Sequence, residues 1–182
     1  MDAKKIFKNS MIRLMKENSF ENITVAMILE ESTLSRSTFY RYFKDKYDLL
    51  NYYYQSNVVA IFETAHYDSW ELYLKAIYKL LLDNYEYFKK ALAVKSANSF
   101  YDFLYEFSYD YVKEAYVKIK GSDCLDTKTK ITIGYVTKGQ AHMLKMWILH
   151  GAKESVDDMA RWAYELISDD CRNVLDAYCR ST

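Results

Sequence analysis

The chain has 182 residues, 51% of them hydrophobic, and its 25 Lys and Arg balance 25 Asp and Glu, so its net charge is zero. It contains no proline and only four glycines, which favours long helices and argues against a β-sandwich. The first residues are charged, no apolar stretch is long enough to cross a bilayer, and the three cysteines form no CxxC pair. We therefore expect a cytoplasmic protein with no membrane partner and no disulfide framework.

The first 45 residues predict a unit of three short helices. Apolar residues recur at helical spacing over residues 2–17, which predicts the first helix. Thr24 can begin the second, because its side-chain oxygen can accept a hydrogen bond from an unpaired backbone N–H, and Ser32-Thr33 interrupts the pattern. A unit of this size is too small to be robust alone. Residues 1–45 are therefore expected to pack on a larger body, residues 46–182.

The third helix is expected to carry the functional surface. Ser35 can begin it, and Phe39, Tyr42 and Phe43 recur at spacings that turn them inward. The outer face is then left with hydroxyl, guanidinium and phenol groups, from Arg36, Ser37, Thr38, Tyr40 and Arg41. A helix and a tight turn followed by such a polar, basic helix form a helix-turn-helix motif, whose second helix lies in the major groove of DNA. Residues 35–46 hold four basic residues and one acid, which favours phosphate binding over a merely solvated helix end.

This arrangement predicts particular contacts with DNA. Helix starts offer unpaired backbone N–H groups to phosphates, which predicts phosphate contacts at Thr24, Ser35 and Lys46. The Tyr40 hydroxyl can add another. Arg36 can pair with a guanine edge, and the methyl group of Thr38 can touch a thymine.

Four stretches stand together in this region: Ile23-Thr24-Val25, the run SRSTFYRYF at 35–43, Asp45-Lys46 and Leu49-Leu50. In this combination they closely resemble the TetR family of transcriptional regulators, over about residues 20–50. The resemblance implies a homodimer that binds double-stranded DNA at a palindromic operator. It also implies DNA contacts at the positions of Thr24, Ser35, Arg36, Ser37, Thr38, Tyr40 and Lys46.

One residue departs from the family pattern. The family usually has glycine at the turn position that Thr33 occupies. Glycine adopts a left-handed backbone conformation without steric cost, whereas a β-branched threonine resists it. We therefore expect a turn that is built differently from the family's.

Residues 46–182 predict a body made of helices, so the whole fold is expected to be all-α. A helix over about 46–66 links this body to the N-terminal unit, residues 1–45. Gly121 to Asp126 is the clearest loop. Apolar residues at helical spacing predict the remaining helices, over 70–82, 85–94, 98–118 and 127–150, and a last one that runs from Ser155 as a single stripe to Tyr178.

The last two predicted helices are the expected dimerisation element. They carry small and large apolar residues that suit a close helix–helix contact, namely Gly139, Met143, Trp147 and Trp162. Packing within one subunit is the alternative. The stretch Gly139 to Gly151, followed by the helix from Ser155, further resembles the C-terminal region of the dihydroxyacetone-kinase-regulator type of TetR-like protein.

The chain contains 19 tyrosines, and tyrosine suits ligand pockets because it combines a ring face with one hydroxyl. Four of them are candidates for lining an effector pocket among the central helices: Tyr101, Tyr105, Tyr109 and Tyr135. The alternative is that these are half-buried residues of the core and its rim. That a small-molecule effector exists is implied by the resemblance, and no cofactor is expected.

The function that agrees best with these features is a repressor that leaves DNA when an effector changes the distance between the two DNA-binding units of the dimer. A helical dimeric adaptor that no longer reads DNA is the alternative, which Thr33 and the zero net charge keep open. An enzyme is not expected, because no Gly-rich phosphate loop, nucleophile elbow or HExxH motif is present. A zinc site is not expected either, since the scattered histidines, His66, His142 and His150, would need Cys124 or Cys171 as a further ligand.

Overall fold

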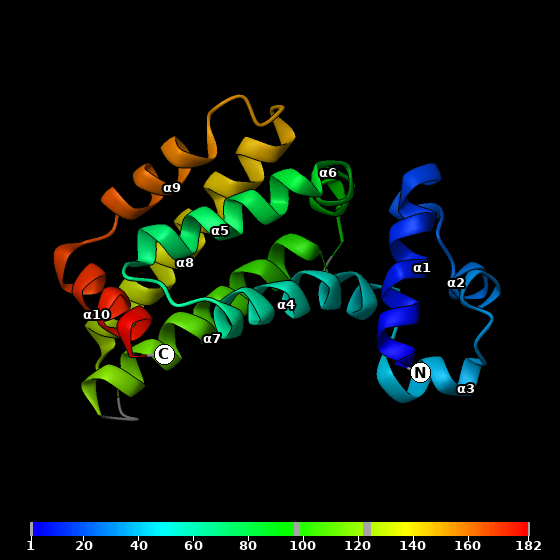
Figure 1. The fold of residues 1–182 in the computed structure, drawn as a ribbon, viewed down its shortest axis with the longest axis horizontal. Helices are drawn as coiled ribbons and strands as arrows, with labels where there is room; N and C mark the ends of the chain where they lie inside the picture. Colours follow the sequence, from blue (N-terminus) through cyan, green and yellow to red (C-terminus); the bar gives the residue numbers. More distant parts are fainter. Residues whose placement is uncertain (1, 97–98, 122–124, 182) are drawn as a thin grey trace.

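The computed structural model describes residues 2–96, 99–121 and 125–181. Within these ranges it contains ten α-helices, one 3-10 helix and no strand, so the expected all-α fold is confirmed. In chain order the elements are α1 (Ala3–Glu17), η1 (Phe20–Asn22), α2 (Val25–Ser32), α3 (Arg36–Tyr42), α4 (Lys46–Thr64), α5 (Trp70–Asp83), α6 (Tyr85–Ala93), α7 (Phe100–Lys120), α8 (Thr127–Leu149), α9 (Val156–Glu165) and α10 (Asp169–Arg180). Figure 1 shows α1 to α3 gathered at one end of the molecule as a head, with α4 running from it into a body of α5 to α10.

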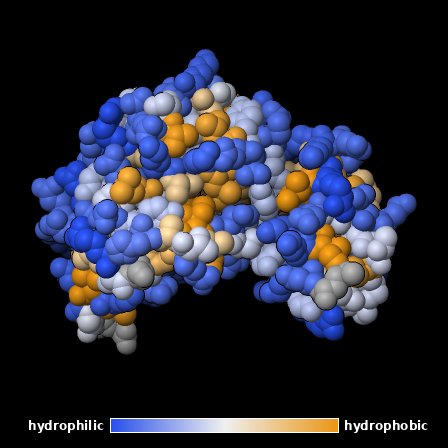
Figure 2. Space-filling model, in the orientation of Figure 1, coloured by the Kyte–Doolittle hydropathy of each residue, from blue (hydrophilic) through white to orange (hydrophobic). Residues whose placement is uncertain are grey.

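An aromatic cluster holds the head together. Phe7 of α1 meets Phe39 of α3 and Phe43 edge to face, with ring centroids 5.3 and 6.1 Å apart. Ile28 of α2 and Leu49 of α4 are fully buried in the same core. Because the first turns of α4 help to close this core, the head and the start of α4 pack as one unit. Figure 2 shows this unit as a lobe set off from the body by a notch.

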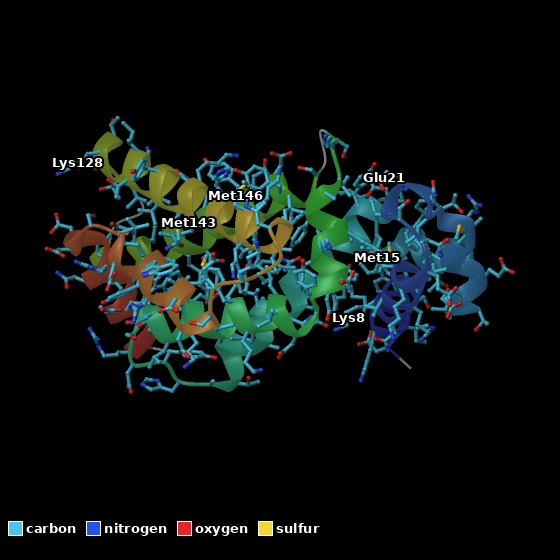
Figure 3. The ribbon with its side chains drawn as sticks, turned by 90° about the horizontal axis from the view of Figure 1, so that it is seen from above. Lys8, Met15, Glu21, Lys128, Met143 and Met146 are labelled. Carbon is cyan, nitrogen blue, oxygen red and sulfur yellow. The ribbon has the colours of Figure 1, made fainter. Side chains whose placement is uncertain are left out.

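Lys90 of α6 joins the body to the head. Its ammonium group donates hydrogen bonds to the carbonyl oxygens of Met15, Lys16 and Asn18, at 2.5, 3.2 and 3.1 Å. Carbonyls at the C-terminal end of a helix lack partners within it, and the helix dipole favours a positive charge there. The body thus caps the C-terminal end of α1, the helix of the head that stands next to it in Figure 3, where Met15 is labelled.

Aromatic rings also pack the body. Tyr73 of α5 and Tyr111 of α7 lie nearly parallel with centroids 5.7 Å apart, and Tyr178 of α10 stacks on Phe62 of α4 at 5.3 Å. Burial removes water from the phenols and raises the pKa of all of the buried tyrosines, namely Tyr53, Tyr54, Tyr73, Tyr78, Tyr87, Tyr116 and Tyr178. Much of the tyrosine content therefore builds the core.

The expectation of a single last helix is wrong. The chain forms α9 and α10 with a break at residues 166–168, and Leu166, expected on the inner stripe, is 70% exposed. Ser168 has an extended backbone and begins α10, with Asp169 and Asp170 in the first turn. A serine followed by two acids favours a new helix start. The apolar residues on both sides of this start have the spacing of one continuous helix, so spacing alone does not reveal the break.

Asp176 fixes the direction of α10. Its carboxylate accepts a hydrogen bond from the Trp70 backbone N–H at the start of α5, at 2.8 Å, and one from the Tyr164 hydroxyl of α9, at 2.7 Å. These bonds, with burial of Leu175 and Val174, pack α10 back against α5 and α7.

Within the described part of the chain, no helix is both long and apolar enough to span a membrane. In the same part, no group of three or more His, Cys, Asp or Glu residues is placed to hold a metal. Cys124 and the centre of the loop expected at 121–126 lie outside the described residues. Gly121 ends α7 in a left-handed conformation, with φ of 68°.

Candidate nucleic-acid interface

Both expected caps of the helix-turn-helix segment are present. The Thr24 side chain accepts a hydrogen bond from the Met27 backbone N–H at 3.2 Å and begins α2. The Ser35 hydroxyl accepts one from the Thr38 N–H at 3.1 Å and begins α3. It also lies 2.9 Å from the Ser37 hydroxyl and 2.8 Å from that of Thr38. The hydroxyls at the start of α3 therefore form one local network, which fixes the leading turn of the helix.

The outer face of α3 is accessible. Ser35, Arg36, Ser37 and Arg41 are exposed, Thr38 is partly so, and Tyr40 is 50% exposed while its ring packs edge-on against Phe39. Neither arginine pairs with a carboxylate in the ranges that the structure describes. Two guanidinium groups without a carboxylate partner among the described residues, a phenol and a row of hydroxyls thus share one surface at the end of the head.

Tyr42 is not turned inward as expected. It is 37% exposed, with the guanidinium of Arg41 at 5.0 Å and the ammonium of Lys4 at 5.8 Å from its ring centre. Lys4 also lies 5.4 Å from the ring of Tyr52. The structure therefore adds Lys4, from the start of α1, to the basic surface around α3. The basic pair at the start of the sequence, Lys4-Lys5, was the available signal for it.

The turn before α3 has the left-handed conformation that glycine usually adopts, although residue 33 is a threonine. Thr33 has φ of 57° and ψ of 19°, the left-handed conformation that we expected a threonine to avoid. The neighbouring side chain supplies the reason. The buried Ser32 hydroxyl donates to the Leu29 carbonyl at 3.2 Å and accepts from the Leu34 N–H at 3.3 Å. These bonds hold the chain on both sides of Thr33 and offset the cost of its conformation.

Lys46 has a different environment from the one expected for a phosphate ligand. Its ammonium donates to the carbonyl oxygens of Phe20, Glu21 and Ile23 at 3.0, 2.9 and 2.7 Å, and lies 4.7 Å from the Phe20 ring centre. Desolvation by burial lowers its pKa, and the charge of Glu21 opposes that effect. All three N–H donors of the side chain are used within the head. The Lys46 backbone N–H at the start of α4 is the group left for a phosphate.

None of the four tyrosines expected to line an effector pocket faces a cavity in the middle of the body. Tyr135 is 78% exposed, and Tyr105 and Tyr109 lie over Gly134 of α8. The ammonium of Lys138 is 4.7 Å from the ring centre of Tyr101 and 4.3 Å from that of Tyr105. Tyr101, Tyr105 and Tyr109 are half-buried and pack against the rim of the core, so the alternative of rim residues holds for these three. Tyr105 and Tyr109 also line an open surface hollow with Glu106 and Asp110.

A small cavity of about 50 Å³ lies between α4, α5, α7 and α8 instead. Uncharged side chains line it: Tyr54, Val58, Trp70, Tyr73, Leu74, Ile77, Tyr78, Leu104, Phe107, Ser108, Tyr111, Val112, Gln140, Ala141 and Leu144. Hydropathy along the chain does not indicate this cavity, because its lining residues have the pattern of ordinary core residues until the helices are placed in space.

Of the four residues expected at a dimer interface, Trp147 is buried inside its own subunit and cannot reach a partner. It is only 3% exposed, packs edge-on against Tyr78 at 5.3 Å, and donates its indole N–H to the Glu154 carbonyl at 3.1 Å. Trp147 is therefore a core residue of its own subunit. By contrast, Trp162 is 40% exposed and Gly139 faces open space.

An exposed apolar face runs along α8 and α9. Gly139 and Met143 stand on α8 beside a groove that Leu166 and Ala163 close from the α9 side. Met143 is labelled in Figure 3. The most exposed side chains of this face are Ile131 at 66%, Tyr135 at 78% and Leu166 at 70%. We call the residues Ile131, Tyr135, Gly139, Met143, Trp162 and Leu166 the α8–α9 face.

Two family models match the chain. One, described as bacterial regulatory proteins of the tetR family, matches residues 12–53, and the other, described as a transcriptional regulator C-terminal region, matches residues 68–169. Among curated proteins, the transcriptional activator DhaS of the dhaKLM operon from Lactococcus lactis is 24% identical over 93 residues. That alignment spans 50% of this chain and 50% of the relative.

Solved structures share the fold over almost the whole chain. The dihydroxyacetone kinase operon activator DhaS matches with a TM-score of 0.63 at 19% identity, over 91% of this chain and 93% of that one. A TetR transcriptional regulator from Streptococcus agalactiae 2603V matches with the same TM-score at 21% identity and the same coverage.

Proposed function

The chain belongs to the TetR family of bacterial transcriptional regulators and is a DNA-binding regulator, and we propose that it represses transcription by occupying a palindromic operator as a homodimer until a small molecule releases it. The observation that carries the proposal is the outer face of α3. Arg36 and Arg41 have no carboxylate partner among the described residues, and Tyr40 is half exposed beside them. Such groups suit phosphate and base edges.

The dimer would form through the α8–α9 face. An apolar surface of this kind on one side of a soluble protein marks a contact with another protein. A second copy is the natural occupant, because a two-fold contact matches the two-fold symmetry of a palindromic operator. Of the residues first expected there, Gly139, Met143 and Trp162 remain in this proposal, while Trp147 does not.

The body is suited to control the head through α4 and α6. Tyr54 and Val58 of α4 line the internal cavity, and the same helix begins at Lys46, which holds the chain before α2. Lys90 of α6 holds the end of α1. A ligand that fits one arrangement of these helices better than another shifts the spacing of two heads, with a coupling of about 1–3 kcal/mol in typical cases. We place the boundary between head and body at residue 45.

Activation is the second candidate. The curated relative from Lactococcus lactis is named as a transcriptional activator, and the same head would serve either outcome. An adaptor that no longer reads DNA is the third, and the accessible basic face of α3 speaks against it.

In vitro selection from random duplex DNA with the full chain tests the proposal. We expect a palindrome to be enriched and bound with a steep dependence on salt. Arg36→Ala combined with Tyr40→Phe should abolish this binding, whereas Lys113→Ala, which removes an exposed positive charge from α7, should not. A reporter behind the selected site then separates repression from activation. Sequence-indifferent binding by the wild-type chain would favour the adaptor.

A further inference from the structure

We infer that the cavity between α4, α5, α7 and α8 takes an uncharged, single-ring aromatic molecule that carries a carbonyl oxygen. The inference rests on the proposed function, because it names the class of effector that the body would sense. Its starting point is the lining: six of the fifteen side chains are aromatic, and they come from α4, α5 and α7. Flat rings stack or meet edge to face with such walls, with a gain beyond the area that they bury.

The lining excludes ions. None of the fifteen residues is acidic or basic, and burial raises the pKa of Tyr54, Tyr73 and Tyr78, so these phenols stay neutral at physiological pH. A carboxylate, phosphate or ammonium group in this cavity would lose its hydration without gaining a charged partner, which is strongly unfavourable. The ligand must therefore be neutral.

Two polar groups of the wall, the Trp70 indole N–H and the Tyr111 hydroxyl, meet no hydrogen-bond partner within the described residues, and the indole can only donate. Trp70 is 3% exposed and lines the cavity, and its indole N–H meets no hydrogen-bond acceptor within the described residues. The Trp70 backbone N–H, by contrast, is bonded to Asp176. A buried donor that is left unpaired is costly, so an acceptor on the ligand would recover a lost hydrogen bond. A carbonyl oxygen is such an acceptor and carries no charge.

The small size of the cavity disfavours any ligand larger than a single ring, because a cavity that binds benzene measures roughly 150 Å³. The 50 Å³ of this cavity holds about four water-sized groups at 10–15 Å³ each. Drug-sized ligands occupy pockets of about 300 Å³ or more. Even one ring must spread the walls, and the neighbouring Tyr73 and Tyr111 rings, already parallel with an angle of 5° between their planes, are the walls that can admit it by sliding. Binding would thus move α5 relative to α7.

Three matched compounds test the inference by titration calorimetry on the full chain. Acetophenone has the ring and the carbonyl, α-methylstyrene has the same shape without the oxygen, and benzoate adds a negative charge. We expect acetophenone to bind roughly three- to tenfold more tightly than α-methylstyrene, the range of one net hydrogen bond, and benzoate not to bind. Equal affinity for the first two, tighter binding of benzoate, or no binding of any would overturn the inference.

Variants locate the binding. Ala141→Leu fills the cavity and should abolish binding of acetophenone. Trp70→Phe should bring the affinity for acetophenone down to that for α-methylstyrene. Leu72→Ala, at an exposed position of the same helix outside the cavity, should leave the preference for acetophenone intact. Undiminished binding to Ala141→Leu would overturn the assignment of the site.

Operator binding is measured separately, so that the two proposals can fail independently. If the chain selects a palindrome but binds none of the three compounds, the ligand class is wrong and the DNA-binding function stands. If acetophenone binds in the cavity without changing operator affinity, the ligand class stands and release by this effector is wrong.

Discussion

Lys46 and Lys90 bind consecutive parts of one stretch of backbone. Lys90 of α6 donates hydrogen bonds to the carbonyls of residues 15, 16 and 18, and Lys46 of α4 donates to those of residues 20, 21 and 23. Within the connection from α1 to α2, the Asn22 and Ile23 N–H groups bond to the carbonyls of Ser19 and Phe20. Two lysines from helices outside the connection supply further hydrogen bonds to its carbonyls. Two ammonium groups thus add to the apolar packing that holds this stretch of the head.

Replacing Lys90 with methionine keeps the apolar stem and removes the ammonium. We expect the free energy of unfolding to fall by about 1–3 kcal/mol, because three carbonyls at the end of α1 lose a charged donor. Urea denaturation followed by circular dichroism measures the change. Lys89→Met is the control, since that lysine is exposed and lies over the Tyr85 ring; an equal loss in both variants would show that the hydrogen bonds of Lys90 contribute nothing particular.

Thr33→Gly should stabilise the protein. Glycine accepts the left-handed conformation of residue 33 without the steric cost that threonine bears, about 1–2 kcal/mol, although its greater freedom in the unfolded chain offsets part of the gain. We expect a net gain of up to about 1 kcal/mol, measured as above. Thr33→Ala, which keeps a Cβ in the same strained place, should give no gain. If alanine stabilised as much as glycine, the threonine side chain rather than the backbone would be the cause.

Arg36 and Lys4 should affect DNA binding in different ways. Arg36 stands at the first turn of α3, where base edges are read, so Arg36→Ala should relax the choice of base at one position and weaken operator binding by about 1–3 kcal/mol. Lys4 lies beside Tyr42 at the edge of this surface, so Lys4→Ala should weaken all sequences alike and lower the salt slope by about one. Anisotropy titrations at several salt concentrations distinguish them, and identical profiles would contradict the assignment.

Charge on the α8–α9 face should separate the subunits. Leu166→Asp replaces an apolar side chain that is 70% exposed with a carboxylate. The charge lowers the stability of the folded monomer little, but its burial in a contact between subunits is strongly unfavourable. Sedimentation velocity should show a shift from dimer to monomer. Leu82→Asp, at an exposed leucine of α5, is the matched control. Trp147→Phe should lower stability and leave the association unchanged; a dimer that survives Leu166→Asp but not Trp147→Phe would contradict the proposed interface.

Alkaline pH should unfold the protein through its buried phenols. Burial raises the pKa of Tyr178 to about 12, and burial together with a hydrogen bond from the Tyr164 hydroxyl to Asp176 raises that of Tyr164 to about 12. A group whose pKa is higher in the folded state stabilises it fully below the unfolded pKa, near 10, and loses that contribution as the pH rises through the folded value. We expect constant stability up to about pH 10 and a steep loss above it. Tyrosinate absorbance should rise together with unfolding; ionisation of all tyrosines in a folded chain below pH 10 would contradict this.

Most of the head could be predicted from the sequence, because its signals are local, although the positions of the Tyr42 ring and the Lys46 ammonium were not. Thr24 and Ser35 cap the helices that they were expected to cap, and Phe39 and Phe43 turn inward as their spacing indicates. The conformation of Thr33 was not predicted, because the Ser32 hydrogen bonds that hold the chain on both sides of it are not visible in sequence spacing.

The body was harder to predict for a physical reason. Whether Trp147 faces its own core or another subunit depends on how α8 is rotated about its axis, and both outcomes have the same helical spacing. The same holds for the tyrosines of α7. Tyr111 reaches the cavity and Tyr105, six residues before it, lies over Gly134 on α8. Only the packed arrangement of four helices decides which aromatic residues enclose a space.

Gln140 gives the proposed dimer a property that neither site has alone. Its side chain is part of the wall of the internal cavity, part of the groove on the α8–α9 face, and bonded to the Ala163 carbonyl of α9 at 3.3 Å. A ligand that moves the Gln140 amide also moves the α8–α9 face, through which the two subunits would meet. Because the two-fold axis relates the two faces, a change on one side of the contact is matched on the other. The first ligand bound would then prepare the second cavity, so the dose–response of such a regulator would be sigmoidal, with a Hill coefficient between one and two.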